Sequence, residues 1–461
     1  YERLVEPVVA RGRPTGELRG ALARSWRRSD DGRTWTFEIQ AGHRFNDGSA
    51  VDATAVKASF DRLRAVGRGP AQILDMPKEV EARGGSTVVF HLDRPFPLFA
   101  QMLALPMFSI VNPKVAAHAV GGDAGSAWLS RTSAGSGPYR VVEWRRGQWV
   151  RLAANPASSA RRAYFDGVRI EAIRDDLSRV AQLRRGGVDI MTGVAAELAP
   201  HLAASPHIRI LAGPSATLTY LEMNNRRRPL DDARVRRAIS LSADRAGMVQ
   251  GLLLGRARLV SGVLPPGMAG ADTGLPAPAR DLRQARALLA AAGRPDRGPL
   301  KLSYMPGDPV LDAVAVTLQA NLADTGLRVV LEPLSPSAFN EKVRFAGDFD
   351  LALRSYGADF PDPWIVMDPV YASASAGPAG NVSRYANGRV DALLRQAALT
   401  DGPARLALYM QAQRMIVADT PHAILYSPDS LLAQRDDILG PAPNYWQPDL
   451  LDVAHMTRRR P

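Results

Sequence analysis

The sequence FDLALRSYGADFPDPW, residues 349–364, carries the strongest structural signal in this chain. Phe349, Leu351 and Leu353 alternate along it, which is typical of a β-strand. Asp359 then follows between aromatic residues, just past the carboxyl end of that strand, where open α/β sheets bind small ligands. A carboxylate between aromatic walls suits a positively charged group such as an amine. The alternative interpretation is a proline-rich surface loop whose acids only shape turns.

The residues before this stretch alternate between strand and helix patterns. Strands are predicted at 300–304 and 327–331, and a helix is predicted between them from the apolar face of Leu311, Val314, Leu318 and Leu322. A second helix, marked by Phe339 and Val343, precedes the strand at 349–353. Strand–helix alternation predicts an α/β fold class with a parallel sheet and right-handed crossovers. The sheet would place Asp359 at a carboxyl edge.

The first third of the chain has the pattern of strands and hairpins. Residues 35–39 and 88–92 alternate between apolar and polar side chains, and a hairpin is predicted over 139–152. Asp52 is the expected N-cap of a helix whose apolar face carries Val56, Phe60 and Leu63. The middle of the chain changes to helices, with Asp231-Asp232 and Asp244 as expected caps.

Composition bounds the class of protein. A chain of 461 residues predicts two or three domains, and 46% hydrophobic with 23% charged residues is typical of a soluble globular protein. The formal net charge of +12 raises the question of an anionic partner. The arginines are scattered among acids, however, so we expect no nucleic-acid partner. The absence of cysteine excludes disulfides, thiolate metal sites and cysteine nucleophiles within these residues.

Catalytic motifs are missing from the sequence. It has no G-x-S-x-G elbow, no phosphate-binding P-loop, no H-E-x-x-H and no dinucleotide fingerprint. The seven histidines are scattered, with no pair at metal-ligand spacing. We therefore expect no catalytic residues, no metal and no cofactor. A dispersed triad leaves no local motif, so a hydrolase of peptides or glycosides stays as the alternative from another functional class.

Several motifs, in order along the chain, resemble one family, the large extracytoplasmic solute-binding proteins of ABC importers (family 5). These proteins carry peptides, nickel chelates and related solutes. The motif GSGPY resembles the family's G-T-G-P-[YFW], and LDDARVRRA resembles its P-[FL]-D-D-x-R-V-R-x-A helix start. The resemblance spans essentially the whole chain and rests on residues 1–5, 22–26, 29–32, 35–37, 45–48, 56–60, 135–139, 230–238, 347–350 and 356–363.

The resemblance implies a two-lobed periplasmic-binding-protein fold of the large, three-subdomain type, with a hinge between the lobes. Lobe one is expected to take residues 1–240 and 435–461, with an N-terminal subdomain at about 1–153. Lobe two, the α/β ligand-binding lobe, is expected at 241–434, with chain crossings after Asn224-Asn225 and near Arg435. The family's mature chains begin with about one more strand, so a segment that can carry a lipid-anchoring cysteine is expected before Tyr1. The expected location is the periplasm, or a lipid anchor outside the cytoplasmic membrane.

The resemblance also assigns ligand-binding residues. In the peptide binders the aspartate that Asp359 matches holds the peptide α-ammonium, and Tyr356 and Phe360 flank it here. Trp364 is a further pocket candidate, with core packing as its alternative. A dipeptide-specific member holds the solute carboxylate with an arginine after the strand matching 300–304, but this chain reads MPGDP there. Arg384 is the candidate substitute cation, with a solvent-exposed arginine as the alternative.

The implied function is the substrate-binding component of an ABC importer. The protein would capture a peptide-like or other amine-bearing solute by hinge closure and, as a monomer, deliver it to a membrane permease with its ATPase. A nickel or other metal chelate is the alternative solute, because the nickel-binding relatives have an aromatic–Gly–Ala–Pro–Tyr loop at the position of residues 356–360. Asp359 in place of that proline favours amines. A receptor or chaperone-like module that signals through its closed state is a further alternative.

Overall fold

The computed structural model describes residues 1–10, 13–67, 77–159, 163–293, 298–378, 380–440, 445–446 and 451–459. Within these ranges, none of the helices is both long enough and apolar enough to cross a membrane.

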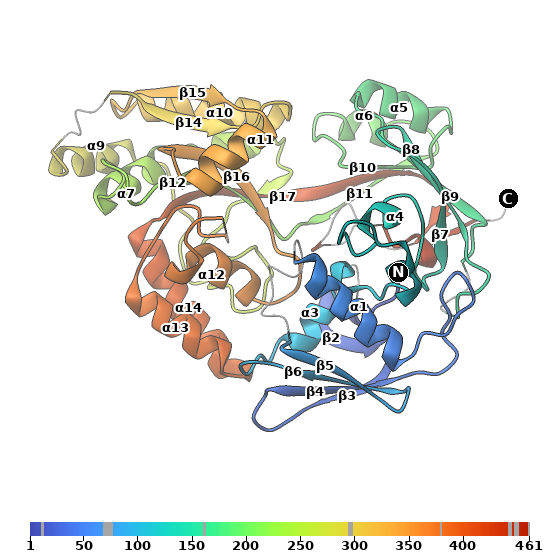
Figure 1. The fold of residues 1–461 in the computed structure, drawn as a ribbon. Helices are drawn as coiled ribbons and strands as arrows, with labels where there is room; N and C mark the ends of the chain where they lie inside the picture. The colour runs from blue at the N-terminus through green and yellow to red at the C-terminus, as the bar shows by residue number, and fades with distance from the viewer. Residues whose placement is uncertain are drawn as a thin grey trace.

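The centre of the molecule is a mixed sheet with eight strands in the described part of the chain (Figure 1). Its main path runs β10-β17-β12-β16-β14-β15, and β11 and β13 also pair with β17. The strands are β10 (Ile190–Thr192), β11 (Ile208–Pro214), β12 (Thr217–Met223), β13 (Ala257–Arg258), β14 (Leu300–Tyr304), β15 (Val329–Pro333), β16 (Leu351–Gly357) and β17 (His422–Arg435).

The predicted parallel arrangement is confirmed for three of these strands. β14 pairs in parallel with both β15 and β16, as the strand–helix alternation requires. β12 is antiparallel to β16 and to β17, so the sheet as a whole is mixed. β16 begins two residues later than predicted and ends at Gly357, which places Asp359 just past its carboxyl end.

The long strand β17 joins two parts of the sheet (Figure 1). Its first half pairs with β12, from Glu222 opposite His422. Its second half pairs with β11, from Pro214 opposite Asp429. The pairing partner therefore changes at 214–217 on one side and 427–429 on the other. The lobe boundaries at 240/241 and 434/435 stay a prediction. This change of pairing partners favours chain crossings between the lobes at 214–217 and 427–429.

Helices cover the β14–β16 part of the sheet and close its apolar core, formed by residues such as Leu302, Leu318 and Leu351. Asp232 and Asp244 cap their helices as predicted, and Asp308, which was not predicted as a cap, caps a third; each accepts a hydrogen bond from the first turn. The helical segments here are α7 (Ala233–Ser242), α8 (Arg245–Gly247), a π-helical turn (Met248–Leu252), α9 (Leu282–Ala291), α10 (Pro309–Ala323), α11 (Pro336–Phe339) and a second π-helical turn (Asn340–Ala346).

The N-terminal part of the chain forms separate small sheets. One is the antiparallel sheet β3-β4-β6-β5, covered by α1, whose N-cap is Asp52 as predicted. The predicted hairpin at 139–152 is confirmed as β7 and β8, extended by β9. The elements are β1 (Val5–Ala10), β2 (Arg13–Gly20), β3 (Ala23–Arg28), β4 (Thr34–Ile39), α1 (Ala53–Val66), β5 (Glu79–Arg83), β6 (Thr87–His91), α3 (Phe99–Leu103), α4 (Ser126–Leu129), β7 (Tyr139–Arg145), β8 (Trp149–Ala154) and β9 (Gly167–Glu171).

One apolar cluster connects this N-terminal part to helices that follow β16. Phe37, Phe90 and Phe99 belong to the same cluster as Ile365 and Tyr409. In Figure 1 these helices lie beside the N-terminal sheet. They are α12 (Trp364–Tyr371), α13 (Gly388–Ala398) and α14 (Gly402–Asp419). A separate, smaller cluster packs α5 (Asp176–Arg184) and α6 (Ala199–Ala203) against β10 and β11, and β18 (Ile438–Leu439) pairs with β19 (Thr457–Arg458).

Candidate functional site

Strand β16 presents Tyr356 at the end of the sheet. Tyr356 stands opposite Leu218 of β12 and is half-buried. Its hydroxyl donates a hydrogen bond of 2.6 Å to the carbonyl of Ile365, so the ring ties the strand to the start of α12. Burial raises the pKa of Tyr356, and the negative charge of Asp359 acts in the same direction. The tyrosine is therefore a neutral hydrogen-bond donor beside the loop acid.

Asp359 lies in a loop whose start is anchored to the sheet. The amide of Ala358 donates to the carbonyl of Ala216 at 3.0 Å, and Ala358 is fully buried. Asp359 itself is half-buried. The predicted position past the carboxyl end of a strand is confirmed, and the structure brings Asp359 and Tyr356 together as the sequence predicts. Its role as an ammonium acceptor stays a prediction.

A buried ion pair between Asp362 and Arg405 holds the same loop against α14. The two terminal nitrogens of the Arg405 guanidinium, Nη1 and Nη2, donate to the two oxygens of Asp362 at 2.5 and 2.8 Å, and the Arg405 side chain is only 7% exposed. Arg405 also donates to the Tyr409 hydroxyl at 3.0 Å. Asp362 Oδ1, one of these two oxygens, also accepts from the amide of Trp364, the first residue of α12, at 2.8 Å. Sequence reasoning missed Arg405, because it lies 43 residues away in α14.

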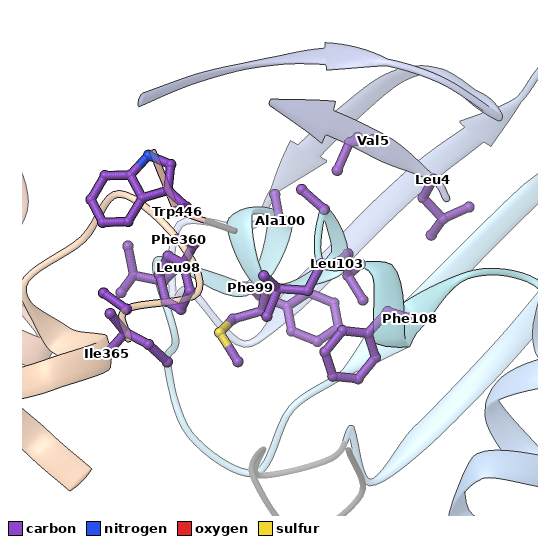
Figure 2. Packing of buried hydrophobic residues seen from close by; sticks show 14 of the residues in the cluster. Leu4, Val5, Leu98, Phe99, Ala100, Leu103, Phe108, Phe360, Ile365 and Trp446 are labelled. Carbon is purple, nitrogen blue, oxygen red and sulfur yellow. The ribbon is translucent and has the colours of Figure 1, made fainter. Parts of the chain in front are cut away.

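The two other aromatic candidates pack beside each other in the same apolar cluster, with their ring centroids 6.4 Å apart. Phe360 is 3% exposed and packs in the core, where Figure 2 shows its ring among Leu98, Ile365 and Trp446. Trp364 is half-buried, and its ring meets that of Phe96 edge-on at 5.2 Å. Both rings thus connect the loop to the N-terminal part of the chain, Phe360 from a buried position and Trp364 from a half-buried one. Neither ligand-binding role is tested by these contacts.

Asp368, one turn after Trp364, is a further acid near the loop that sequence reasoning missed. Burial raises its pKa, while Arg94 and the Trp364 side chain act in the opposite direction. A carboxyl with a raised pKa beside a candidate ligand loop is a common feature of functional sites. The only sequence signal for Asp368 as a site residue was its spacing of four residues from Trp364, because this spacing places both side chains on one face of a helix.

The structure places Arg384 away from the other four candidates. It lies against Gly347, which precedes β16, and lines a cavity there with Asn224, which follows β12. Asp359 lies past the opposite end of β16. A strand of this length spans about 20 Å, so Arg384 and Asp359 belong to different ends of the sheet. Within this structure Arg384 therefore does not join the Asp359 loop.

A buried charged cluster lies on the face of the sheet that carries Tyr356. Arg354 donates to Glu222 at 3.1 Å, and His422 lies 3.0 Å from the other oxygen of the same carboxylate. Glu222 and the His422 side chain are each 1% exposed. Burial opposes the charge of Glu222, but His422 and Arg354 outweigh it and lower the pKa of Glu222. The only sequence signal for this cluster is the presence of charged residues within otherwise apolar strands. Its members lie too far apart along the chain to form a sequence motif.

In the described part of the chain, no group of three or more histidine, aspartate and glutamate residues has the arrangement of a metal site. The segment after β14, where a dipeptide-specific member of the family carries an arginine, provides Asp308 here as the N-cap of α10.

A mixed α/β sheet with a loop past the carboxyl end of β16 is the arrangement expected of a two-lobed solute-binding protein. The family model described as "Bacterial extracellular solute-binding proteins, family 5 Middle" matches residues 17–378. The chain belongs to this family, as its sequence motifs predict.

Relatives and solved structures agree with this assignment. The chain is 35% identical to the probable D,D-dipeptide-binding periplasmic protein DdpA of Escherichia coli K12, over 95% of this chain and 85% of that protein. It is 28% identical to the glutathione-binding protein GsiB of Shigella dysenteriae, over 88% and 80%. The fold matches the ABC transporter-associated periplasmic binding protein DppA from Helicobacter pylori in complex with the peptide STSA, with a TM-score of 0.87 and 25% identity over 100% and 92% of the two chains.

The same fold also occurs in a protein solved with a metal chelate. NikZ from Campylobacter jejuni, in complex with Ni(L-His), matches with a TM-score of 0.83 and 20% identity over 99% of this chain and 94% of that one. The predicted two-lobed binding-protein fold is therefore confirmed, and so is the predicted function of solute binding for an ABC importer.

Proposed function

We propose that this protein binds a small peptide with a free amino group and holds the ammonium at Asp359. The observation that carries the proposal is the position of Asp359, past the carboxyl end of β16, next to the neutral hydroxyl of Tyr356. Its loop is held by the Asp362–Arg405 ion pair, so the carboxylate is held in place before a solute arrives. The named binding partners of the relatives, a D,D-dipeptide and glutathione, both carry a free amine, and this supports the same class.

Closure of two lobes would strengthen this contact. Burying a charged carboxylate costs several kcal/mol, and a bound ammonium offsets much of that cost. Water excluded by closure also lowers the local dielectric constant and strengthens the ion pair. The hinge we propose consists of the β11–β12 connection and the middle of β17, where pairing changes. The closed monomer, with its solute bound, then docks on the outer face of a membrane permease, and an ATPase partner of the permease drives transport.

The experiment compares solutes with and without a free amine. The purified protein is titrated by calorimetry with D-alanyl-D-alanine, L-dipeptides and glutathione, and with the N-acetylated form of whichever binds most tightly. We expect acetylation to weaken binding at least a hundredfold, because it removes the charge that Asp359 pairs with. Equal affinity for the free and acetylated solutes would contradict the ammonium contact.

Metal chelates and turnover are tested with the same protein. Ni(L-His) is included in the titrations because NikZ, which shares the fold, was solved with that chelate. We expect Asp359, which stands where a proline is expected in chelate binders, to favour the peptides. Each peptide is also recovered after a long incubation and analysed by chromatography, and we expect it unchanged, because the protein acts by binding and not by hydrolysis.

A further inference from the structure

A cavity lies at the opposite end of β16 from Asp359. It has a volume of about 490 Å³, and its lining is mostly arginine. It lies where the chain leaves β12 and enters β16. The lining residues are Asn224, Arg226, Arg227, Arg228, Gly347 and Arg384.

The walls of this cavity are fixed by buried hydrogen bonds. The Asn224 side chain donates to the carbonyls of Gly347 and Phe349, at 3.0 and 3.1 Å. The Asn225 amide donates to the carbonyl of Ser383 at 2.8 Å, which joins the loop of Arg384 to the loop of the other three arginines. Asn224 and Ser383 are 4% and 0% exposed. The two loops that carry the arginines are therefore held together by the fold.

Positive charge exceeds negative charge in the cavity. Arg227 is neutralised by Asp348 and Asp350, each at 2.7 Å. Arg228 has Asp231 at 3.7 Å. Within the ranges that the structure describes, neither Arg226 nor Arg384 has an ion pair with a carboxylate. Two guanidinium groups thus remain for a ligand.

Arg384 is held in the cavity at some energetic cost. Its φ is +56°, a left-handed conformation that is strained for a non-glycine residue. Its guanidinium lies directly against Gly347, where a Cβ would overlap it, and Gly347 itself has a φ of +68°. The glycine therefore provides the space that Arg384 occupies. A strained residue held against such a glycine is typical of a functional position.

We propose that this cavity is an oxyanion site that binds a phosphate group through Arg226 and Arg384. A guanidinium is planar and donates pairs of parallel hydrogen bonds, which match the oxygens of a phosphate. The site differs from the Asp359 loop in charge and in place, so it does not bind the amine of the transported solute. The phosphate can be free or can belong to the headgroup of an anionic lipid, which presents the same chemistry.

The test measures inorganic phosphate binding by calorimetry at low ionic strength. The variant Arg226→Gln/Arg384→Gln removes the two unpaired charges. The control Arg389→Gln/Arg395→Gln removes two exposed charges from α13, outside the cavity lining. We expect the first variant to lose at least tenfold in phosphate affinity and the control to stay within twofold of the parent. Circular dichroism verifies folding, and the single variant at exposed Arg226 gives a partial loss if the double variant is unstable.

Vesicles distinguish the two sources of phosphate. Sedimentation with phosphatidylglycerol vesicles, with phosphatidylcholine vesicles as reference, identifies a lipid headgroup if the parent binds and the cavity variant does not. Phosphate binding without vesicle binding identifies a free anion. Absence of both, or equal loss in the control variant, overturns the proposal. The affinity for the amine-bearing solute should be unchanged in the cavity variant. A failure of the phosphate proposal can therefore be distinguished from a failure of the ammonium proposal at Asp359.

Discussion

The Arg405 guanidinium binds both carboxylate oxygens of Asp362, and the two side chains are 7% and 13% exposed. This pair joins α14 to the loop that carries Asp359. The loop is therefore fixed from within the core, and its stability can be tested separately from solute binding.

Replacing Arg405 by methionine should destabilise the protein strongly. The change leaves Asp362 buried without its partner, which typically costs about 3–5 kcal/mol. The free energy of unfolding in urea measures the effect. Arg395→Met, at an exposed position of α13, is the matched control and should change stability by less than about 0.5 kcal/mol. A loss below about 1 kcal/mol for Arg405→Met would show that the loop does not depend on this pair.

Tyr356→Phe should lower stability modestly. It removes the 2.6 Å hydrogen bond to the carbonyl of Ile365, worth about 1 kcal/mol, and keeps the aromatic ring. Solute affinity should change less than fivefold, since the wall beside Asp359 remains. Tyr164→Phe is the control, because that hydroxyl bonds an exposed carbonyl at 3.1 Å and should contribute little. Equal stability of Tyr356→Phe and the parent would contradict the hydrogen bond's role.

Phe360→Ala separates a packing role from a ligand-wall role. The side chain is 3% exposed, and Figure 2 shows its ring among Leu98, Ile365 and Trp446. Truncating a buried phenylalanine costs about 3–5 kcal/mol, so we expect a clear loss in the free energy of unfolding. A large drop in peptide affinity with unchanged stability would instead assign Phe360 to the pocket wall.

Stability should depend on pH through Glu222. Its pKa is lower in the folded protein than the value of 4.5 for a free side chain, because His422 and Arg354 outweigh the effect of burial. The ionised form therefore favours folding. This contribution is fully present above pH 4.5 and is lost as the pH falls through the lowered folded pKa.

Urea unfolding of the parent and of Glu222→Gln between pH 7 and pH 3 measures the Glu222 contribution. The difference in unfolding free energy should be constant above about pH 5 and shrink at lower pH. A difference that grows towards low pH would contradict the sign.

Local patterns were sufficient to predict the elements around Asp359. The alternating residues of β14 and β16, the helix between them and the cap at Asp232 are all set by neighbours along the chain, and the structure confirms them. The antiparallel pairing of β12 with β16 and β17 depends on long-range contacts that no local pattern contains.

Distant partners limited the prediction of the site. Arg354 and Glu222 are 132 residues apart, so their ion pair had no sequence signature. Arg384 was predicted as a cation for the solute because of its residue type, but the register of β12 and β16 places it at the far end of the sheet. Phe360 was predicted as a wall from its position beside Asp359, and this role stays a prediction; that its ring also packs against the N-terminal part depends on contacts distant in sequence.

The central claim is that Asp359 holds the ammonium group of a bound peptide, and calorimetry on Asp359→Asn tests it most directly. The solute is the tightest binder among D-alanyl-D-alanine, the L-dipeptides and glutathione, and Asp30→Asn, at an exposed position, is the control. We predict at least a hundredfold loss of affinity for Asp359→Asn, with unchanged thermal stability and a control equal to the parent. Unchanged affinity of a folded Asp359→Asn variant would contradict the account.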